Sequence, residues 1–351
     1  MRVARSIALD DVRVEEVAEP EPGPGEVVCE VLACGVCASD VTDWYVAQKL
    51  PAVLGHELAG IVCGVGEGVS AVAVGDRVAI HHHVPCGECR RCRRGHETMC
   101  EQFRATNLDP GGFAERVRVP AELVDELLPL PDALDPVAAT FIEPLACVLR
   151  AQDRARLRSG DSLLVIGAGV GGLLHVAAAH ARGVEAVWVR EPRAERRARA
   201  EAIGAERHSN ELVDTAIVCT PKPEAIVAGA ESLAPGGTLC LYAPPAPDAP
   251  PAFDGTSLFF RELTITASYS AGPRDMRAAL ELLADGLVNP APLVSHRLAL
   301  EQTARALELQ RRGEGLKAVV LPAGERGAGA RGAGARDAGE RDTGQPAAGE
   351  Q

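Results

Sequence analysis

Aromatic residues are scarce in this chain of 351 residues: they make up 3% of the sequence, whereas 46% of it is hydrophobic. The core therefore has to be filled by aliphatic side chains. The sequence also lacks any apolar run of the roughly 18 residues that a membrane-spanning helix needs. Its N-terminal segment lacks the apolar stretch of a signal peptide. These absences predict a cytoplasmic protein with no membrane partner.

Positive charge is also in deficit, because 36 lysines and arginines face 49 aspartates and glutamates, for a formal net charge of −13. A nucleic-acid partner is excluded, since it would require a basic face to offset the phosphates. The arginine-rich stretch from Arg190 to Ala200 is a local exception. Its helical spacing is typical of a solvated helix face, and phosphate binding by one or two arginines is the alternative.

The texture of the chain changes near Asp135. Residues 1–120 consist of short alternating runs separated by turn residues, which predicts an all-β half, either a barrel or a sandwich. Beyond Asp135, short apolar strands alternate with helical stretches, the pattern of a parallel α/β sheet. After Pro322 the sequence has no large apolar residue, so residues 323–351 are predicted to be a disordered tail.

Cysteine, in contrast, is frequent, and four of the eleven cysteines share one short stretch: Cys86, Cys89, Cys92 and Cys100. In a reducing compartment, clustered cysteines are more often metal ligands than disulfide partners. Four thiolates complete a tetrahedron around zinc and leave no position for a substrate. We therefore predict a structural zinc site here, with disulfide pairing as the alternative.

A glycine-rich turn lies between a predicted buried strand and a helix. Gly167 allows the tight turn, Gly169 lets the backbone approach a pyrophosphate, and Gly172 lets the helix pack on the strand. Val170 and Gly171 complete the turn, whose helix N-terminus would face the phosphate charge. The pattern predicts a dinucleotide site, and a βαβ unit that binds no nucleotide is the alternative.

The strand after this turn ends at Glu191. A carboxylate there would accept hydrogen bonds from the ribose hydroxyls of NAD and would repel the 2′-phosphate of NADP. Arg190 and Arg193 flank it, and Arg193 is included in the predicted cofactor site. NAD is therefore the predicted cofactor, and NADP remains the alternative.

A catalytic zinc needs mixed ligands and one exchangeable position. Four residues that lie apart in the sequence are candidates: Cys37, His56, Glu57 and Glu143. Each has an ordinary alternative, because a lone cysteine is usually part of the core, a lone histidine is usually hydrogen-bonded, and a glutamate before proline is often a helix cap. Their spacing alone does not decide between these interpretations.

Together with the glycine turn and the cysteine cluster, however, these residues resemble a known family. The chain is similar to the zinc-containing medium-chain alcohol dehydrogenases, within them the polyol (sorbitol-like) and threonine dehydrogenase branch. The resemblance covers about residues 1–322 and rests on "GHELAGIVCGVGEGV", "GDRV", the four-cysteine loop, "GGFAE" and "EPLA".

The resemblance implies a GroES-like β-barrel catalytic domain over residues 1–143 and a Rossmann domain with a doubly wound parallel sheet over residues 144–280. Residues 281–322 would return to the catalytic domain, and the active site would lie in the cleft between the domains. It also implies a homodimer or homotetramer. The family normally has a helix between the third and fourth Rossmann strands, and this sequence leaves only a few residues there. We expect that edge of the domain to be trimmed.

The resemblance also implies roles for the catalytic residues. Cys37 and His56 would be zinc ligands, and Glu57 and Glu143 would be their acidic partners, one of which coordinates directly. Asp40 would orient the ligand histidine.

Three further positions concern proton transfer and the pocket. Ser39 would relay the substrate proton. Thr42 stands where some family members end the relay in a histidine, so the proton would pass directly to water. His83 fits a threonine dehydrogenase pattern and would either reach the pocket or be an ordinary strand residue. His81 and His82 are expected to be surface or packing residues.

The implied enzyme contains two zinc ions per chain, one catalytic and one structural, and acts on a small-molecule alcohol. The catalytic zinc would lower the pKa of the substrate hydroxyl, and the alkoxide would transfer hydride to NAD. The substrate would be a secondary alcohol: a polyol, a cyclitol or a sugar derivative. A threonine-type amino-alcohol dehydrogenase and a non-catalytic nucleotide-binding protein of the same fold are the alternatives.

Overall fold

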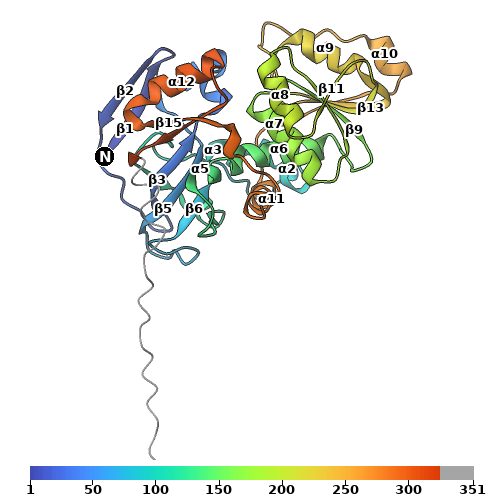
Figure 1. Cartoon of the computed structure of the whole chain (residues 1–351). Coiled ribbons are helices and arrows are strands. Elements are labelled where there is room, and N and C mark those ends of the chain that lie inside the picture. Colours follow the sequence, from blue (N-terminus) through green and yellow to red (C-terminus); the bar gives the residue numbers. More distant parts are fainter. Residues whose placement is uncertain (325–351) are drawn as a thin grey trace, which may run out of the picture.

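The computed structural model describes residues 1–324, so the predicted tail lies outside the described residues except for its first two. Two lobes make up this part of the chain (Figure 1). The first combines the N-terminal segments, blue to cyan, with the C-terminal segments, orange to red; the second is green to yellow. Within residues 1–324, no helix is both long and apolar enough to cross a bilayer.

The first lobe is built on two mainly antiparallel sheets. One has the strand order β2-β1-β4, and the other has the order β15-β16-β3-β5-β6-β8, with β7 paired to β3. The strands are β1 (Arg2–Ala8), β2 (Asp11–Glu16), β3 (Val27–Gly35), β4 (Ala52–Val53), β5 (Glu57–Val65), β6 (Arg77–Ile80), β7 (Arg116–Val119), β8 (Leu128–Pro129), β15 (Val294–Ala299) and β16 (Lys317–Leu321). Because β16 pairs with β3, the end of the chain completes the sheet that its beginning starts.

Short helices connect these strands. They are η1 (Ala38–Val41), α1 (Asp43–Val46), α2 (Arg90–Arg93), η2 (Glu97–Met99), α3 (Glu101–Ala105), α4 (Ala121–Val124), α5 (Pro136–Ala139), η3 (Ala291–Leu293), η4 (Leu300–Gln302) and α12 (Thr303–Arg312). The core beneath them consists mostly of Val, Leu, Ile and Ala side chains, as the composition predicts. Phe113 is the aromatic member of this core, whereas the fully buried Phe103 and Phe141 belong to two other clusters.

The second lobe contains a six-stranded parallel sheet with the order β11-β10-β9-β12-β13-β14. This is the order of a doubly wound dinucleotide-binding sheet, and it confirms the predicted fold class. The strands are β9 (Ser162–Ile166), β10 (Ala186–Arg190), β11 (Glu206–Arg207), β12 (Val213–Val218), β13 (Leu233–Leu241) and β14 (Thr264–Ala267). The helices are α7 (Val170–Ala181), α8 (Ala194–Ala202), α9 (Pro223–Glu231) and α10 (Gly255–Phe260).

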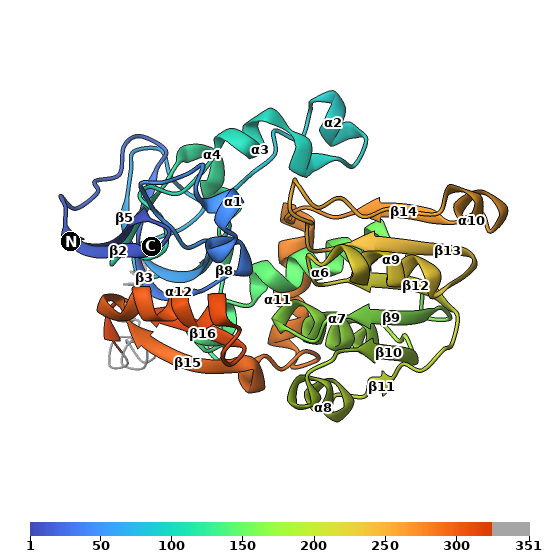
Figure 2. The same cartoon turned by 90° about the horizontal axis from the view of Figure 1, so that it is seen from above.

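Two helices join the lobes: α6 (Ile142–Arg154) and α11 (Pro273–Ala284). Both lie between the lobes in Figures 1 and 2. Their apolar faces share one core cluster with residues of both lobes, for example Ala59 and Leu128 from the first and Leu174 from the second. Both lobes are therefore anchored to a common packed layer.

The connection from β11 to β12 is short. Strand β11 has two residues, and residues 208–212, all within the described chain, cross to β12 without forming a helix. The side chain of Arg190 occupies this corner: its guanidinium lies 2.9 Å from His208 Nδ1 and donates to Ser232 Oγ at 3.0 Å. Arg190 therefore supports the trimmed edge rather than the glycine turn.

Candidate active site

The four clustered cysteines lie on one loop around α2, and all four sulfur atoms are within 4.8 Å of one another. The separations are 3.5 Å from Cys89 to Cys92, 3.6 Å from Cys100 to Cys86 and 4.0 Å from Cys86 to Cys92. With Zn–S bonds of about 2.3 Å, a tetrahedral site has sulfur atoms about 3.8 Å apart. The cysteines are unpaired and fit a zinc ion.

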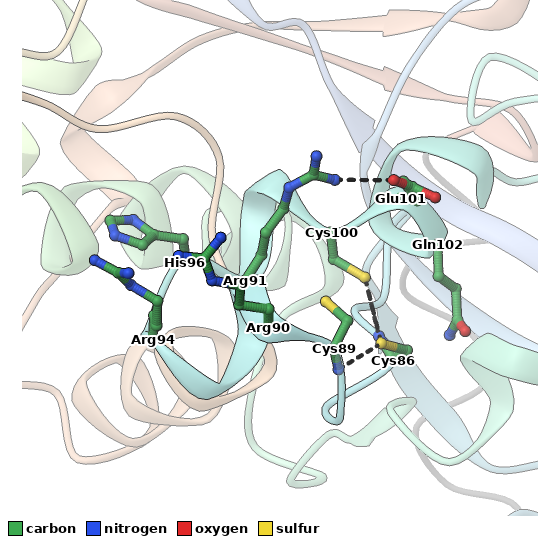
Figure 3. Close-up of a pocket in the computed structure, with 9 residues that line it drawn as sticks. All are labelled: Cys86, Cys89, Arg90, Arg91, Arg94, His96, Cys100, Glu101 and Gln102. Carbon is green, nitrogen blue, oxygen red and sulfur yellow. Dashed lines mark hydrogen bonds and ion pairs between the residues drawn. The ribbon is translucent and has the colours of Figure 1, made fainter.

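Figure 3 shows the surroundings of this loop. The sulfur atoms of Cys86, Cys89 and Cys100 turn toward one another, whereas Arg91 extends away from them to Glu101. Backbone N–H groups of Cys86 and Cys89 each donate to a cysteine sulfur at 3.4 Å. Such N–H donors stabilise thiolates, so the backbone of the loop favours the charge state in which cysteines bind a metal.

A second donor set lies where β3 ends and β5 begins: the ligand atoms of Cys37, His56 and Glu57 are within 4.8 Å of one another. The strand register explains this. Because Gly35 of β3 pairs with Glu57 of β5, residues just after β3 and just before β5 must lie side by side. One thiolate, one imidazole and one carboxylate are the mixed donors that a catalytic zinc uses.

Asp40 holds two of these residues in place. Its Oδ2 accepts a hydrogen bond from the Cys37 N–H at 2.9 Å, and its Oδ1 lies 3.4 Å from His56 Nδ1. Burial alone would raise the pKa of Asp40, but the charge and hydrogen bond of His56 outweigh burial and lower it. With Nδ1 turned to Asp40, the Nε2 atom of His56 is left for a metal.

Glu57 has a partner that the sequence did not reveal. Lys317 at the start of β16 donates to Glu57 Oε2, and its Nζ also donates to the Val36 carbonyl at 3.1 Å. Both side chains are almost fully buried. The other carboxylate oxygen, Oε1, is buried with no hydrogen-bond partner among residues 1–324, so it is available to coordinate a cation.

Glu143, in the first turn of α6, lies in a third donor set with His81 and His82. Burial raises the pKa of its carboxyl, and the thiol of Cys147 lies 3.3 Å from its Oε1. The ring of His82 lies 4.9 Å from that of His56, which places this set beside the Cys37 set. His82 packs against the rings of His56 and His83, which agrees with a packing role, and it also lies in this third donor set.

The two histidines present nitrogen atoms to this space. His81 Nε2 and His82 Nδ1 are buried and have no hydrogen-bond partner in the described part of the chain. Burial lowers the pKa of His81 to about 3 and that of His82 well below its usual range, so both imidazoles are neutral. No sequence pattern marked them, because β6 ends just before His81 and the direction of the following side chains depends on the fold.

The remaining predicted residues lie around these sets. Thr42 turns its hydroxyl back to donate to the Ala38 carbonyl at 2.9 Å, and Ser39 lies on the same short helix as Asp40. His83 Nδ1 contacts the carbonyl of Thr106, and its ring packs against His82 and Phe103. His83 therefore packs against the ring of His82, and within residues 1–324 it is not grouped with other potential metal donors.

The glycine turn has the geometry that a pyrophosphate requires. Gly167 has a φ of +97°, and a Cβ on Gly172 would overlap the Gly167 carbonyl. The helix α7 begins at Val170 with Gly169 as its N-cap. Glu191 lies against this turn, where its carboxylate accepts from the N–H of Ala168 at 2.8 Å and of Arg193 at 2.9 Å.

Comparisons with known proteins agree with this arrangement. The family model described as alcohol dehydrogenase GroES-like domain matches residues 23–132, and the model described as zinc-binding dehydrogenase matches residues 169–285. The L-threonine 3-dehydrogenase of Pyrococcus horikoshii is 32% identical over 334 residues, covering 87% of this chain and 94% of that protein. The chain belongs to the zinc-dependent alcohol dehydrogenase family.

Two further proteins resemble this alcohol dehydrogenase. The sorbitol dehydrogenase of Bacillus subtilis is 31% identical over 339 residues, 89% of this chain and 94% of that protein. The structure of alcohol dehydrogenase TADH from Thermus sp. ATN1 superposes with a TM-score of 0.80 and 31% identity, covering 92% of this chain and 99% of that one. The predicted family, fold class, enzyme class, and zinc and nicotinamide cofactors are confirmed. The roles of individual residues stay predictions.

Proposed function

We propose that this alcohol dehydrogenase oxidises a secondary hydroxyl of a polyol, cyclitol or sugar derivative with NAD. The observation that carries the proposal is the pair of adjoining donor sets, one suited to a catalytic zinc and one that presents neutral histidines. A neutral imidazole nitrogen can accept or donate a hydrogen bond, as a hydroxyl can. A donor set with two such unpaired nitrogens suits a substrate that carries more than one hydroxyl.

Cys37, His56 and Glu57 would hold the catalytic zinc, with the unpartnered Oε1 of Glu57 as its carboxylate donor. Lys317 keeps the other oxygen of Glu57 occupied and offsets its charge. Glu143 would face the open position from the side of His82. When bound, zinc supplies a Lewis acid that lowers the pKa of the substrate hydroxyl, and NAD supplies the hydride acceptor.

Ser39 would take the substrate proton. It lies two residues after Cys37, on η1. Thr42 holds its hydroxyl on the Ala38 carbonyl, so the proton would leave from Ser39 to water rather than through a longer chain of side chains. Asp40 contributes by fixing the orientation of His56.

The choice of NAD over NADP rests on two features of the turn. The carboxylate of Glu191 lies where a 2′-phosphate would add a second negative charge. Of the arginines near Glu191, Arg193 and Arg196 donate to the Gly313 carbonyl at 3.0 and 2.8 Å, and Arg197 donates to the Glu191 carbonyl at 2.9 Å. Their guanidinium groups are already engaged, which weakens the alternative of NADP binding.

A threonine-type activity is the second candidate, since relatives named L-threonine 3-dehydrogenase share 32% identity with this chain. His83 was the residue that favoured it in the sequence. Its Nδ1 contacts the Thr106 carbonyl and its ring lies against Phe103. These contacts leave His83 less available for a hydrogen bond to an amino-acid substrate, whereas His82 has an unpaired nitrogen for a hydroxyl.

The same proposal includes a homo-oligomer in the cytoplasm. Strand β14 is an edge strand with mostly exposed side chains, and Phe259 and Phe260 beside it are 76% and 78% exposed. An open strand edge next to exposed aromatic rings is suited to pairing with a second copy. The eleven unpaired cysteines fit a reducing compartment.

Zinc quantitation combined with NAD reduction across polyols, inositols, threonine and simple alcohols tests this function. Two zinc ions per chain and the highest kcat/KM on a polyol or cyclitol are expected. Preferred turnover of threonine would replace the proposal with the second candidate. Glu143→Ala should lose turnover while the protein stays folded, and an unaltered rate would remove Glu143 from the site.

A further inference from the structure

Gly171 is set apart from the other glycines of the cofactor turn by what lies over it. It is the second residue of α7, and its φ is not among the positive values that favour glycine. A Cβ at Gly171 would lie 2.7 Å from Cε1 of the Tyr242 ring. Backbone conformation therefore does not require glycine here, but the tyrosine ring does.

Tyr242 is held firmly in this place. It directly follows β13, and its N–H donates to the Val218 carbonyl at the end of β12, at 3.1 Å. His175, one helical turn after Gly171, meets the tyrosine ring edge to face, with centroids 4.7 Å apart and an angle of 86°. Such T-shaped contacts orient aromatic rings.

His175 has no evident role other than this contact. Both of its ring nitrogens are buried without a hydrogen-bond partner in residues 1–324, and burial lowers its pKa to about 3. It is thus a neutral aromatic ring on the inner face of α7. Gly171, His175 and Tyr242 therefore form one packed unit. The Tyr242 ring, which follows β13, packs against α7 at Gly171 and at His175.

Tyr242 lies over Gly171 of the cofactor turn and packs against the core cluster that includes residues of α6, the helix that carries Glu143. In a doubly wound sheet the first half binds the adenosine part, here beside Glu191, and the second half takes the nicotinamide part. Tyr242 belongs to the second half, at the carboxyl end of β13. Burial raises the pKa of its hydroxyl well above the usual range, and the ionisable groups that add to the rise are Cys147, Cys219, Glu143 and Cys37.

We infer that Tyr242, seated in the space that Gly171 leaves, is the wall against which the nicotinamide ring packs. The pair would then set how closely C4 of the nicotinamide approaches the substrate carbon. This inference rests on the proposed function for the direction in which the cofactor lies. A side chain at position 171 and a large ring at position 242 cannot both fit, so the two residues act as one steric element.

The test measures binding of NADH and of ADP-ribose, which lacks the nicotinamide, to the zinc-loaded protein and its variants. Tyr242→Ala should weaken NADH binding about 3- to 10-fold, the range for one lost aromatic contact, and leave ADP-ribose binding unchanged. Tyr242→Phe is the matched control and should bind both ligands as the native protein does, since it keeps the ring.

The role of Gly171 is tested by adding a side chain at position 171, alone and together with removal of the Tyr242 ring. Gly171→Val should push the tyrosine ring into the cofactor space and weaken NADH binding about tenfold or more. The double variant Gly171→Val with Tyr242→Ala should recover most of that loss. NADH binding unchanged in Tyr242→Ala, equal loss of NADH and ADP-ribose, or no recovery in the double variant would overturn the inference. Native protein that binds NADH but oxidises no polyol would refute the proposed function alone.

Discussion

The two cysteine-containing donor sets differ in how they are assembled. Cys86, Cys89, Cys92 and Cys100 come from one loop around a single helical turn. Cys37, His56 and Glu57 come from the facing ends of two strands and are backed by Lys317, 260 residues away from Glu57. The first site can form from local chain alone, whereas the second exists only when β3, β5 and β16 have paired. A structural site can thus be local, and an open catalytic site depends on the whole lobe.

Cys92→Ser should have the largest effect on folding. It removes one of four zinc ligands from a loop whose small core is made of Cys92, Cys100 and Phe103. Since structural zinc contributes folding energy directly, we expect a loss of several kcal/mol and a melting temperature lower by about 10 °C. Differential scanning calorimetry measures this, and Cys63→Ser, an exposed cysteine, is the control. A stable but inactive Cys92→Ser protein would mean that the cysteine loop holds the catalytic zinc and that the structural role belongs to the Cys37 set.

Cys37→Ser should act on turnover instead. Loss of a catalytic zinc ligand removes the Lewis acid, so kcat should fall about a thousandfold or more. One zinc ion per chain should remain on the cysteine loop, and the melting temperature should change little. Mass spectrometry of metal content together with steady-state kinetics checks both points. Retention of both zinc ions with full activity would exclude Cys37 as a ligand.

Lys317→Met tests whether the catalytic site depends on the distant strand. It leaves the Glu57 carboxylate buried without its cation, and breaking such a pair costs about 3–5 kcal/mol. Urea denaturation should show that loss, and Lys222→Met at the start of α9 is the control. Adding zinc should restore part of the stability, because the ion offers Glu57 another partner. Unchanged denaturation would show that the pair contributes nothing.

Asp40→Asn should have the smallest effect of the four. The amide keeps the size of the side chain but loses the charge that orients His56, and such changes reduce zinc affinity or activity about 10- to 100-fold. Competition with a chromogenic chelator measures the affinity. Asp43→Asn, three residues away on α1 and paired only at the surface with Arg311, should behave like the native protein.

What could be predicted from the sequence follows the same division. The cysteine loop and the glycine turn each lie within a short stretch of sequence, residues 86–100 and 167–172. Spacing alone therefore predicted their chemistry. Cys37, His56, Glu57 and Glu143 were found through the family resemblance, since each is an ordinary residue by itself. Register, not spacing, brings the first three together.

The missed residues are those whose meaning depends on distant contacts. Lys317 lies in the apolar run KAVVL, and a lysine in a buried strand is a usable signal, but its partner could not be named from the sequence. His82 owes its place to the direction of the chain after β6. The inferred role of Tyr242 depends on its ring occupying the space where Gly171 has no side chain, and a glycine within a glycine-rich motif gives no sign of this second constraint in the sequence.

The short connection after β11 makes the two borders of the parallel sheet unequal. One border is β11, a strand of two residues, and it presents few backbone groups to another chain. The opposite border, β14, is four residues long, and most of its side chains are exposed. In the homo-oligomer proposed above, two copies that paired along β14 would carry their β11 edges at the far ends of the shared sheet.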